Sequence, residues 1–166
     1  IPLARRPSAV LGGADPLDPQ WLCGAALDIS AACFTADGRS PAVIFGREDR
    51  HELRVITVEE LEALVHRVAH GVFNLGLEPG AGVALVMPMT PECVAAYLGI
   101  LRAGCCAVSI ADSFPASELR KRLEIGNAVA ILVEAAQRAI GVEPDGDPPM
   151  LMVDGGVENF NGRVDE

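Results

Sequence analysis

Between residues 83 and 133, short apolar runs alternate with segments of helical periodicity, and this alternation constrains the fold more than any other feature. We predict strands over Val83–Met87, Cys105–Ile110 and Ala128–Val133. Helices are predicted between them, over Pro91–Arg102 and Pro115–Ile125. Strands joined through helices pair in parallel with right-handed crossovers. Runs of Val, Ala, Leu and Ile suit strands buried on both faces. The predicted fold class is therefore α/β, with a parallel sheet.

A different pattern precedes this region. Apolar runs over Ala42–Phe45 and Leu53–Ile56 flank a turn, which predicts an initial β-hairpin. Thr57 comes next, with Glu60 three residues later, which is the capping-box pattern at the start of a helix. Apolar residues then recur at helical spacing as far as Gly76. The sequence thus predicts a hairpin followed by a helix before the alternation begins.

The two ends of the chain are less regular. Residues 1–20 are rich in Pro, Gly and Asp and are predicted to form an irregular lead-in, with a short helix after them over Leu27–Phe34. A last short strand is predicted over Leu151–Val153. The chain then ends in polar sequence without closing on a capped element. We therefore expect two parts, an irregular lead-in over 1–20 and an incomplete domain over 21–166.

Charge and hydropathy argue against two classes of partner. The formal net charge is −10, and the densest basic run, Arg120 to Arg122, is followed at once by Glu124. A phosphate-binding surface for nucleic acid needs clustered Lys and Arg, so no nucleic-acid partner is expected. The most apolar stretch, residues 83–111, is interrupted by prolines and charged residues, so no transmembrane segment is expected. Five cysteines without a C-x-x-C motif suit reduced, packed thiols in an intracellular protein.

Few residues have the spacing of a catalytic or binding motif. No Walker phosphate loop and no strand-to-helix G-x-G-x-x-G is present. His66 and His70 share a helix face, but Arg67 stands where a zinc protease needs Glu, so we interpret them as a solvent-exposed pair. Asp112 and Ser113 follow a predicted strand, where ligands gather in parallel sheets. The alternative is that Ser113 only caps the next helix.

Three ordered runs resemble a known family. Val55–Val65 (VITVEELEALV) resembles the first core motif of the adenylate-forming superfamily. Gly82–Glu92 (GVALVMPMTPE) resembles the strand and turn that follow, and Leu98–Asp112 (LGILRAGCCAVSIAD) resembles the second core motif. The resemblance covers roughly residues 21–133. The pairing of MPMTPE with SIADSF is most similar to the acetyl-CoA-synthetase-like branch, and within it to plant-type acyl-activating enzymes.

This resemblance implies an AMP-forming acyl-CoA synthetase. Such an enzyme joins a carboxylate to ATP, giving acyl-adenylate and pyrophosphate, and CoA then displaces AMP. ATP, Mg²⁺ and CoA are the implied cofactors, with a small-molecule carboxylate as substrate. The family's phosphate loop, acidic Mg²⁺ residue, ribose-binding Asp and late Lys do not occur in this chain. The chain is thus expected to be a partial N-terminal subdomain, with no catalytic residue of its own and no activity alone.

The resemblance also implies candidate CoA contacts. Ala111, Asp112, Ser113 and Arg138 match positions that lie near the CoA nucleotide in acetyl-CoA synthetases. The sequence departs from that pattern, because Asp112-Ser113 replaces Gly-Gly and Gly141 stands where a second Arg is usual. A carboxylate beside a phosphate is repulsive.

Two alternatives stay open at this point. One is a free-standing α/β domain that binds a small ligand at the loop after Ile110. The other is a truncated, non-catalytic relative that acts through protein contacts. The compartment, cytoplasmic or peroxisomal, is undetermined, and so are the acyl substrate and the oligomeric state.

Overall fold

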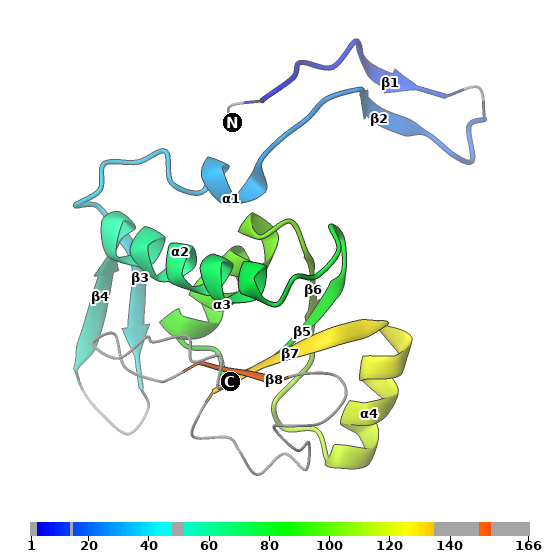
Figure 1. Ribbon diagram of the computed structural model, residues 1–166. Helices are drawn as coiled ribbons and strands as arrows, with labels where there is room; N and C mark the ends of the chain where they lie inside the picture. The colour runs from blue at the N-terminus through cyan, green and yellow to red at the C-terminus, as the bar shows by residue number, and fades with distance from the viewer. Residues whose placement is uncertain (1–2, 14, 48–51, 135–149, 154–166) are drawn as a thin grey trace. The chain divides into compact units, whose positions relative to one another are not determined.

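A computed structural model describes residues 3–13, 15–47, 52–134 and 150–153 (Figure 1). The chain divides into two compact units, Ile1–Thr35 and Ala36–Glu166.

The first unit contains a β-ribbon and one helical turn. Strand β1 (Ala9–Gly12) pairs antiparallel with β2 (Gln20–Cys23), and helix α1 spans Ile29–Ala32. The Asp28 carboxylate caps this helix by accepting a hydrogen bond from the Ala31 backbone N–H. The prediction of an irregular lead-in over 1–20 is wrong at β1, because pairing with β2 orders a segment that carries no local strand pattern.

The second unit begins with the predicted hairpin. Strands β3 (Pro41–Gly46) and β4 (Leu53–Thr57) pair antiparallel, with Ile44 opposite Val55. Helix α2 (Val58–Asn74) follows directly and packs against both strands. The predicted hairpin is confirmed.

The start and end of α2 also follow the sequence. The Thr57 hydroxyl accepts from the Glu60 backbone N–H, and the Glu60 carboxylate accepts from the Thr57 backbone N–H. This reciprocal pair satisfies two N–H groups that have no partner within the helix. Beyond the C-cap Leu75, Gly76 takes a positive φ of 64°, which favours glycine and ends the helix. The capping box is confirmed.

Four parallel strands form the central sheet, in the order β6-β5-β7-β8. The two helices between them are α3 and α4, and the predicted strand–helix alternation is confirmed within one or two residues at each end. The bounds of the strands are β5 (Gly82–Val86), β6 (Cys106–Ser109), β7 (Ala128–Glu134) and β8 (Met150–Val153). The bounds of the helices are α3 (Pro91–Arg102) and α4 (Ala116–Ile125).

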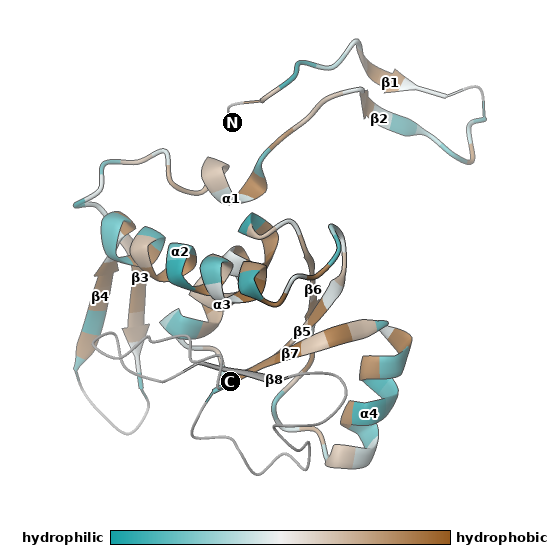
Figure 2. Cartoon of the chain, in the orientation of Figure 1, coloured by the Kyte–Doolittle hydropathy of each residue, from teal (hydrophilic) through white to brown (hydrophobic). Residues whose placement is uncertain are grey.

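The helices cover opposite faces of this sheet. α3 joins β5 to β6, whereas α4 joins β6 to β7 on the far side of β5, so right-handed crossovers place them on opposite faces. Leu119 and Leu123 of α4 pack with Val86 and Ile131 in one core cluster. Val83 and its same-face neighbours are buried on the other side, where α3 contacts β5 and β6. Figure 2 shows the apolar colouring of β5 and β7 that this burial on both faces requires.

Candidate functional site

The connections after β5 and β6 run to opposite faces of the sheet. The loop after β5 leads into α3, and the loop after β6 leads into α4. Such a point, where neighbouring strands send their chains to opposite faces, is where open α/β sheets bind ligands. Pro88, Met89 and Thr90 follow β5, and Ala111, Asp112 and Ser113 follow β6. The fold therefore brings the predicted loop and a second loop to one edge of the sheet.

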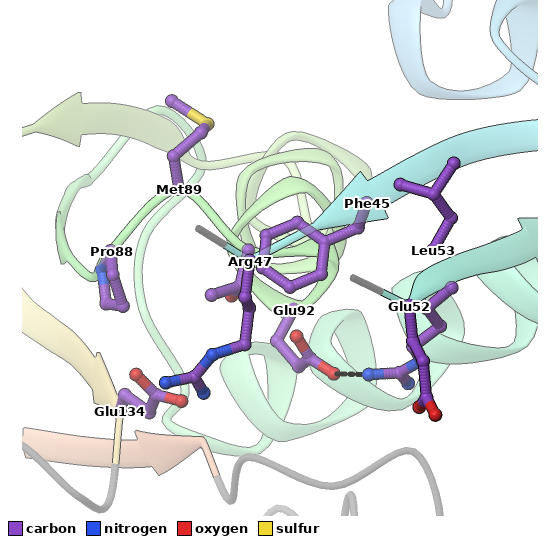
Figure 3. Close-up of a pocket in the computed structure, with 10 residues that line it drawn as sticks. Phe45, Arg47, Glu52, Leu53, Pro88, Met89, Glu92 and Glu134 are labelled. Atoms are coloured by element: carbon purple, nitrogen blue, oxygen red, sulfur yellow. Dashed lines mark hydrogen bonds and ion pairs between the residues drawn. The ribbon is translucent and has the colours of Figure 1, made fainter. Parts of the chain in front are cut away.

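An open pocket of about 860 Å³ adjoins this edge (Figure 3). It lies between the turn end of the β3–β4 hairpin and the carboxyl ends of β5 and β7. Its charged side chains are two arginines and three glutamates, and the rest of its lining is mostly apolar. The lining residues are Phe45, Arg47, Glu52, Leu53, Arg54, Pro88, Met89, Thr90, Glu92 and Glu134.

A partly buried ion pair forms one side of the pocket. Arg54 Nη1 donates to Glu92 Oε1 at 3.2 Å, and the Glu92 side chain is only 5% exposed. Glu92 lies in the first turn of α3, where the Thr90 hydroxyl caps the helix by accepting from the Cys93 backbone N–H. The partial positive charge of a helix N-terminus stabilises a carboxylate there. The pair thus connects the hairpin to the helix that leaves the strand end.

Glu134 ends β7 on the opposite side of the pocket. Burial raises the pKa of this carboxyl above its ordinary value of 4.5, and the negative charges of Glu92 and Asp112 add to the rise. The positive charge of Arg47 acts in the other direction on the same pKa. Figure 3 shows the Arg47 and Glu134 side chains pointing toward one another. Glu134 therefore lies near two further acidic side chains, Glu92 and Asp112, and near the guanidinium of Arg47.

Cys93 lies among the same acidic groups but is not set up as a nucleophile. Burial raises the pKa of its thiol, and the charges of Asp112 and Glu134 raise it further. A reactive cysteine needs a lowered pKa and access to solvent. Cys93 is therefore a packed core thiol, as predicted from the sequence.

The predicted site residues fall in different places. Ala111 and Ser113 are exposed and Asp112 is half-buried at the carboxyl end of β6, close enough to influence Cys93 and Glu134. Arg138, the fourth candidate CoA contact, lies outside the described residues. The alternative role of Ser113 as a helix cap is wrong, because α4 has Pro115 at its N-cap and no side-chain cap hydrogen bond.

His66 and His70 do not form a shared site. Arg102 Nη1 donates to His66 Nε2 at 2.8 Å, and Glu62 lies 3.8 Å from the same nitrogen. His70 instead pairs with Asn74 in the next turn. Both histidines are exposed, as predicted.

Neither a metal centre nor a membrane span is found in the part of the chain that the structure describes. Within that part, no three His, Cys, Asp or Glu side chains are grouped closely enough to hold a metal ion. Over the same residues, no helix has both the length and the apolar character needed to cross a bilayer.

Sequence reasoning missed the pocket residues Arg54, Glu92 and Glu134. Glu134 ends β7 and Glu92 lies in the first turn of the helix after β5, so the rule that ligands gather at strand ends could have singled them out. Arg54 carries no such signal, because its partner lies 38 residues away in the chain.

Comparison with known proteins identifies the family. Residues 32–163 match the family model of the AMP-binding enzyme. Probable acyl-activating enzyme 18, peroxisomal, of Arabidopsis thaliana is 35% identical over 136 residues, covering 77% of this chain and 18% of that protein. Hexanoyl-CoA synthase of Cannabis sativa is 32% identical over 143 residues, covering 81% of this chain and 20% of that protein.

A solved structure agrees with these matches. The crystal structure of CmiS6 superposes with a TM-score of 0.60 at 27% identity, covering 75% of this chain and 29% of that one. The chain spans about a fifth of the length of the curated relatives named above. Because the family model matches most of the chain and its ordered core motifs lie on the expected strands and helices, this chain belongs to the AMP-binding enzyme family.

Proposed function

We propose that this chain is the N-terminal portion of an AMP-forming acyl-CoA synthetase. The observation that carries the proposal is the pair of matches to an acyl-activating enzyme and a hexanoyl-CoA synthase, each over more than three quarters of this chain. An acetyl-coenzyme A synthetase of Candida albicans also matches, at 29% identity over 128 residues. All three names describe activation of a carboxylic acid. In the proposed reaction a carboxylate attacks the α-phosphorus of ATP, pyrophosphate leaves, and the CoA thiol then displaces AMP from the acyl-adenylate.

The cofactors of this reaction are ATP, Mg²⁺ and CoA. Charge neutralisation on the phosphates and in-line positioning are its main physical demands. Residues 21–166 are proposed to be the N-terminal part of the synthetase domain, and the groups that hold ATP and Mg²⁺ are proposed to belong to the rest of the enzyme. The substrate would be a small-molecule carboxylate, and the compartment the cytoplasm or the peroxisome, since the Arabidopsis relative is named as peroxisomal.

The loop after β6 is proposed to contact CoA through Ala111, Asp112 and Ser113, together with Arg138. Its position at the carboxyl end of a parallel strand, beside the point where the chain connections diverge, supports this role. Asp112 would then lie near phosphate groups, and the carboxylates of Glu92 and Glu134 add negative charge nearby. We therefore expect the Asp112 carboxylate to weaken CoA binding by repelling its phosphate groups.

A hybrid enzyme tests the catalytic role. In this hybrid, the chain replaces the aligned segment of Arabidopsis acyl-activating enzyme 18. With ATP, Mg²⁺, CoA and a panel of acids from acetate to hexanoate, the hybrid should release pyrophosphate and form acyl-CoA. The 166-residue chain alone should do neither. A folded hybrid that releases no pyrophosphate with any acid would contradict the proposal and favour a non-catalytic role.

The same hybrid tests the CoA contact. Asp112→Gly should lower the KM for CoA about threefold to tenfold, because removing one like charge near a phosphate is worth roughly 1 kcal/mol. Glu124→Gln, which removes an exposed acidic group from α4, is the matched control. Equal KM values for the two variants would exclude Asp112 from the CoA site.

A further inference from the structure

The loop after β6 ends on Phe114, an aromatic residue that stands directly before the N-cap of α4. Its backbone N–H donates to the Ala111 carbonyl at 3.3 Å, which closes a turn over residues 111–114. The N-cap residue is Pro115, and among the described residues no side chain caps this helix by a hydrogen bond. A capping side chain is the usual connection between a loop and the helix that follows it. Here the turn is therefore fixed to the helix in another way.

Two kinds of contact hold the Phe114 ring. The first is apolar, because the ring packs against the core cluster that contains Ile110, Leu119 and Leu123. The second is a cation–π contact, in which the Arg122 guanidinium carbon lies 4.2 Å from the ring centroid. A cation within about 6 Å of the centroid is attracted to the face of an aromatic ring. The sheet core and α4 thus fix the last residue of the turn together.

Arg122 is itself held in place by its own helix. Its Nη2 atom lies 3.0 Å from Glu118 Oε1, one turn earlier in α4, and both side chains are half-buried. Its Nε atom is buried and has no acceptor among the described residues, so a ligand cannot reach that atom without moving its neighbours. The guanidinium therefore rests on the ring instead of extending toward solvent, which suits a residue that acts through Phe114 and not by direct contact with a phosphate.

Resting on the proposed function, we infer that Arg122 is a positioning residue for CoA. Its guanidinium holds the Phe114 ring, and the ring holds the turn over residues 111–114 at the carboxyl end of β6. Ordering a loop when a ligand binds costs affinity, and a loop that is already ordered avoids this cost. Loss of the Arg122 contact should therefore weaken CoA binding and leave the binding of ATP unchanged.

Steady-state kinetics of the hybrid test this inference. Arg122→Gln should raise the KM for CoA about threefold to fivefold, as expected for the loss of a partly exposed cation–π contact, with no change in the KM for ATP. Lys121→Gln is the matched control, because Lys121 carries the same charge, lies 3.8 Å from the same Glu118 carboxylate and is 71% exposed. An equal rise in the KM for CoA in both variants would overturn the inference, and so would an equal rise in the KM for ATP.

Substitutions of Phe114 separate positioning from direct contact with CoA. Phe114→Leu keeps an apolar side chain but removes the aromatic face, so it should raise the KM for CoA as much as Arg122→Gln does. Phe114→Tyr keeps the face and should leave the KM near that of the parent hybrid. The double variant Phe114→Leu/Arg122→Gln should be no worse than either single variant, because all three lack the same contact. If Arg122→Gln had its full effect in the Phe114→Leu background, Arg122 would contact CoA directly and the inference would be wrong.

Hydrogen exchange supplies a readout that does not depend on activity. In the hybrid without CoA, Arg122→Gln should speed amide exchange over residues 111–117 at least about threefold, because the turn loses one of its two anchors. Exchange over α3, residues 91–102, should not change and shows that the variant is folded. Unchanged exchange over 111–117 would overturn the inference.

This inference and the proposed function fail separately. A hybrid that forms acyl-CoA but has the same KM for CoA with and without Arg122→Gln rejects the positioning role and keeps the proposed function. A hybrid that forms no acyl-CoA rejects the proposed function, and CoA binding is then measured directly by isothermal titration calorimetry. There Arg122→Gln should raise the Kd for CoA by the same factor of about three to five. A parent hybrid that binds no CoA would overturn the positioning role as well.

Discussion

Arg54 Nη1 lies 3.2 Å from Glu92 Oε1, and this contact joins strand β4 to the first turn of α3. The Glu92 side chain is almost fully buried, whereas Arg54 is 39% exposed. A buried carboxylate that loses its partner keeps the cost of its desolvation. The pair therefore holds the hairpin against the sheet edge that lines the pocket.

We predict that Arg54→Met lowers the free energy of unfolding by about 1–3 kcal/mol, less than for a fully buried pair because Arg54 is partly solvated. The double variant Arg54→Met/Glu92→Gln should recover part of that loss, since no unpaired charge remains. Urea unfolding followed by far-UV circular dichroism is the measurement, because the only tryptophan, Trp21, belongs to the first unit. The account would be contradicted if the double variant lost more unfolding free energy than Arg54→Met and Glu92→Gln lose together as single variants.

Gly99 sets the separation of α2 and α3. A Cβ added there would lie 2.5 Å from Val68 Cβ and 3.2 Å from the Ala69 backbone nitrogen. Neither atom can move without shifting the α2 backbone, so we predict that Gly99→Ala destabilises the fold by about 1–3 kcal/mol or more.

Gly71 in α2 is the matched control for this prediction. An added Cβ at Gly71 meets no atom within 4 Å. Gly71→Ala should therefore stabilise the helix by up to about 1 kcal/mol through its higher helix propensity. If Gly99→Ala and Gly71→Ala shifted the urea midpoint in the same direction, the close packing of α2 and α3 would not explain the effect of Gly99→Ala.

Glu134 should make stability depend on pH in the opposite sense to a salt-bridged acid. Burial raises the pKa of this carboxyl in the folded state, so the folded protein holds the proton more tightly than the unfolded chain. Its contribution to stability is present below the ordinary value of 4.5 and is lost as pH rises through the raised pKa.

We predict that Glu134→Gln is more stable than the parent chain at neutral pH and that the difference vanishes below about pH 4. Urea midpoints measured across this range check the sign, with the exposed Glu124→Gln as control. A Glu134→Gln variant that was less stable than the parent at neutral pH, with the gap closing as pH fell, would show that Arg47, rather than burial, dominates the environment of Glu134.

The cysteines should separate into two reactivity classes. All five lie within the described residues as free thiols, with Cys33 and Cys106 exposed and Cys93 and Cys105 buried. Burial raises the pKa of both buried thiols, so less thiolate is available. We predict that iodoacetamide modifies Cys106 at least about tenfold faster than its neighbour Cys105, as read by tandem mass spectrometry. The two rates should converge in urea, and equal rates in the native protein would contradict the burial of Cys105.

Local sequence patterns predicted most of the secondary structure. The capping box joins Thr57 and Glu60, which are three positions apart, and the positive-φ turn depends on Gly76 alone. Both features are local, so they can be identified from the sequence. The alternation from β5 to β7 was predicted in the same way, because apolar periodicity indicates each element separately. Strand β1 was missed because its order depends on pairing with β2 rather than on its own pattern.

The sequence by itself determined the α/β class, the hairpin, the parallel strands and the family motifs. It also placed Asp112 and Ser113 at a strand end. Only the tertiary structure decided which side chains meet at that edge, because Arg54, Glu92 and Glu134 come from three separate elements. Their burial and mutual charges depend on how the hairpin and the sheet pack, and no local pattern encodes a contact across 38 residues.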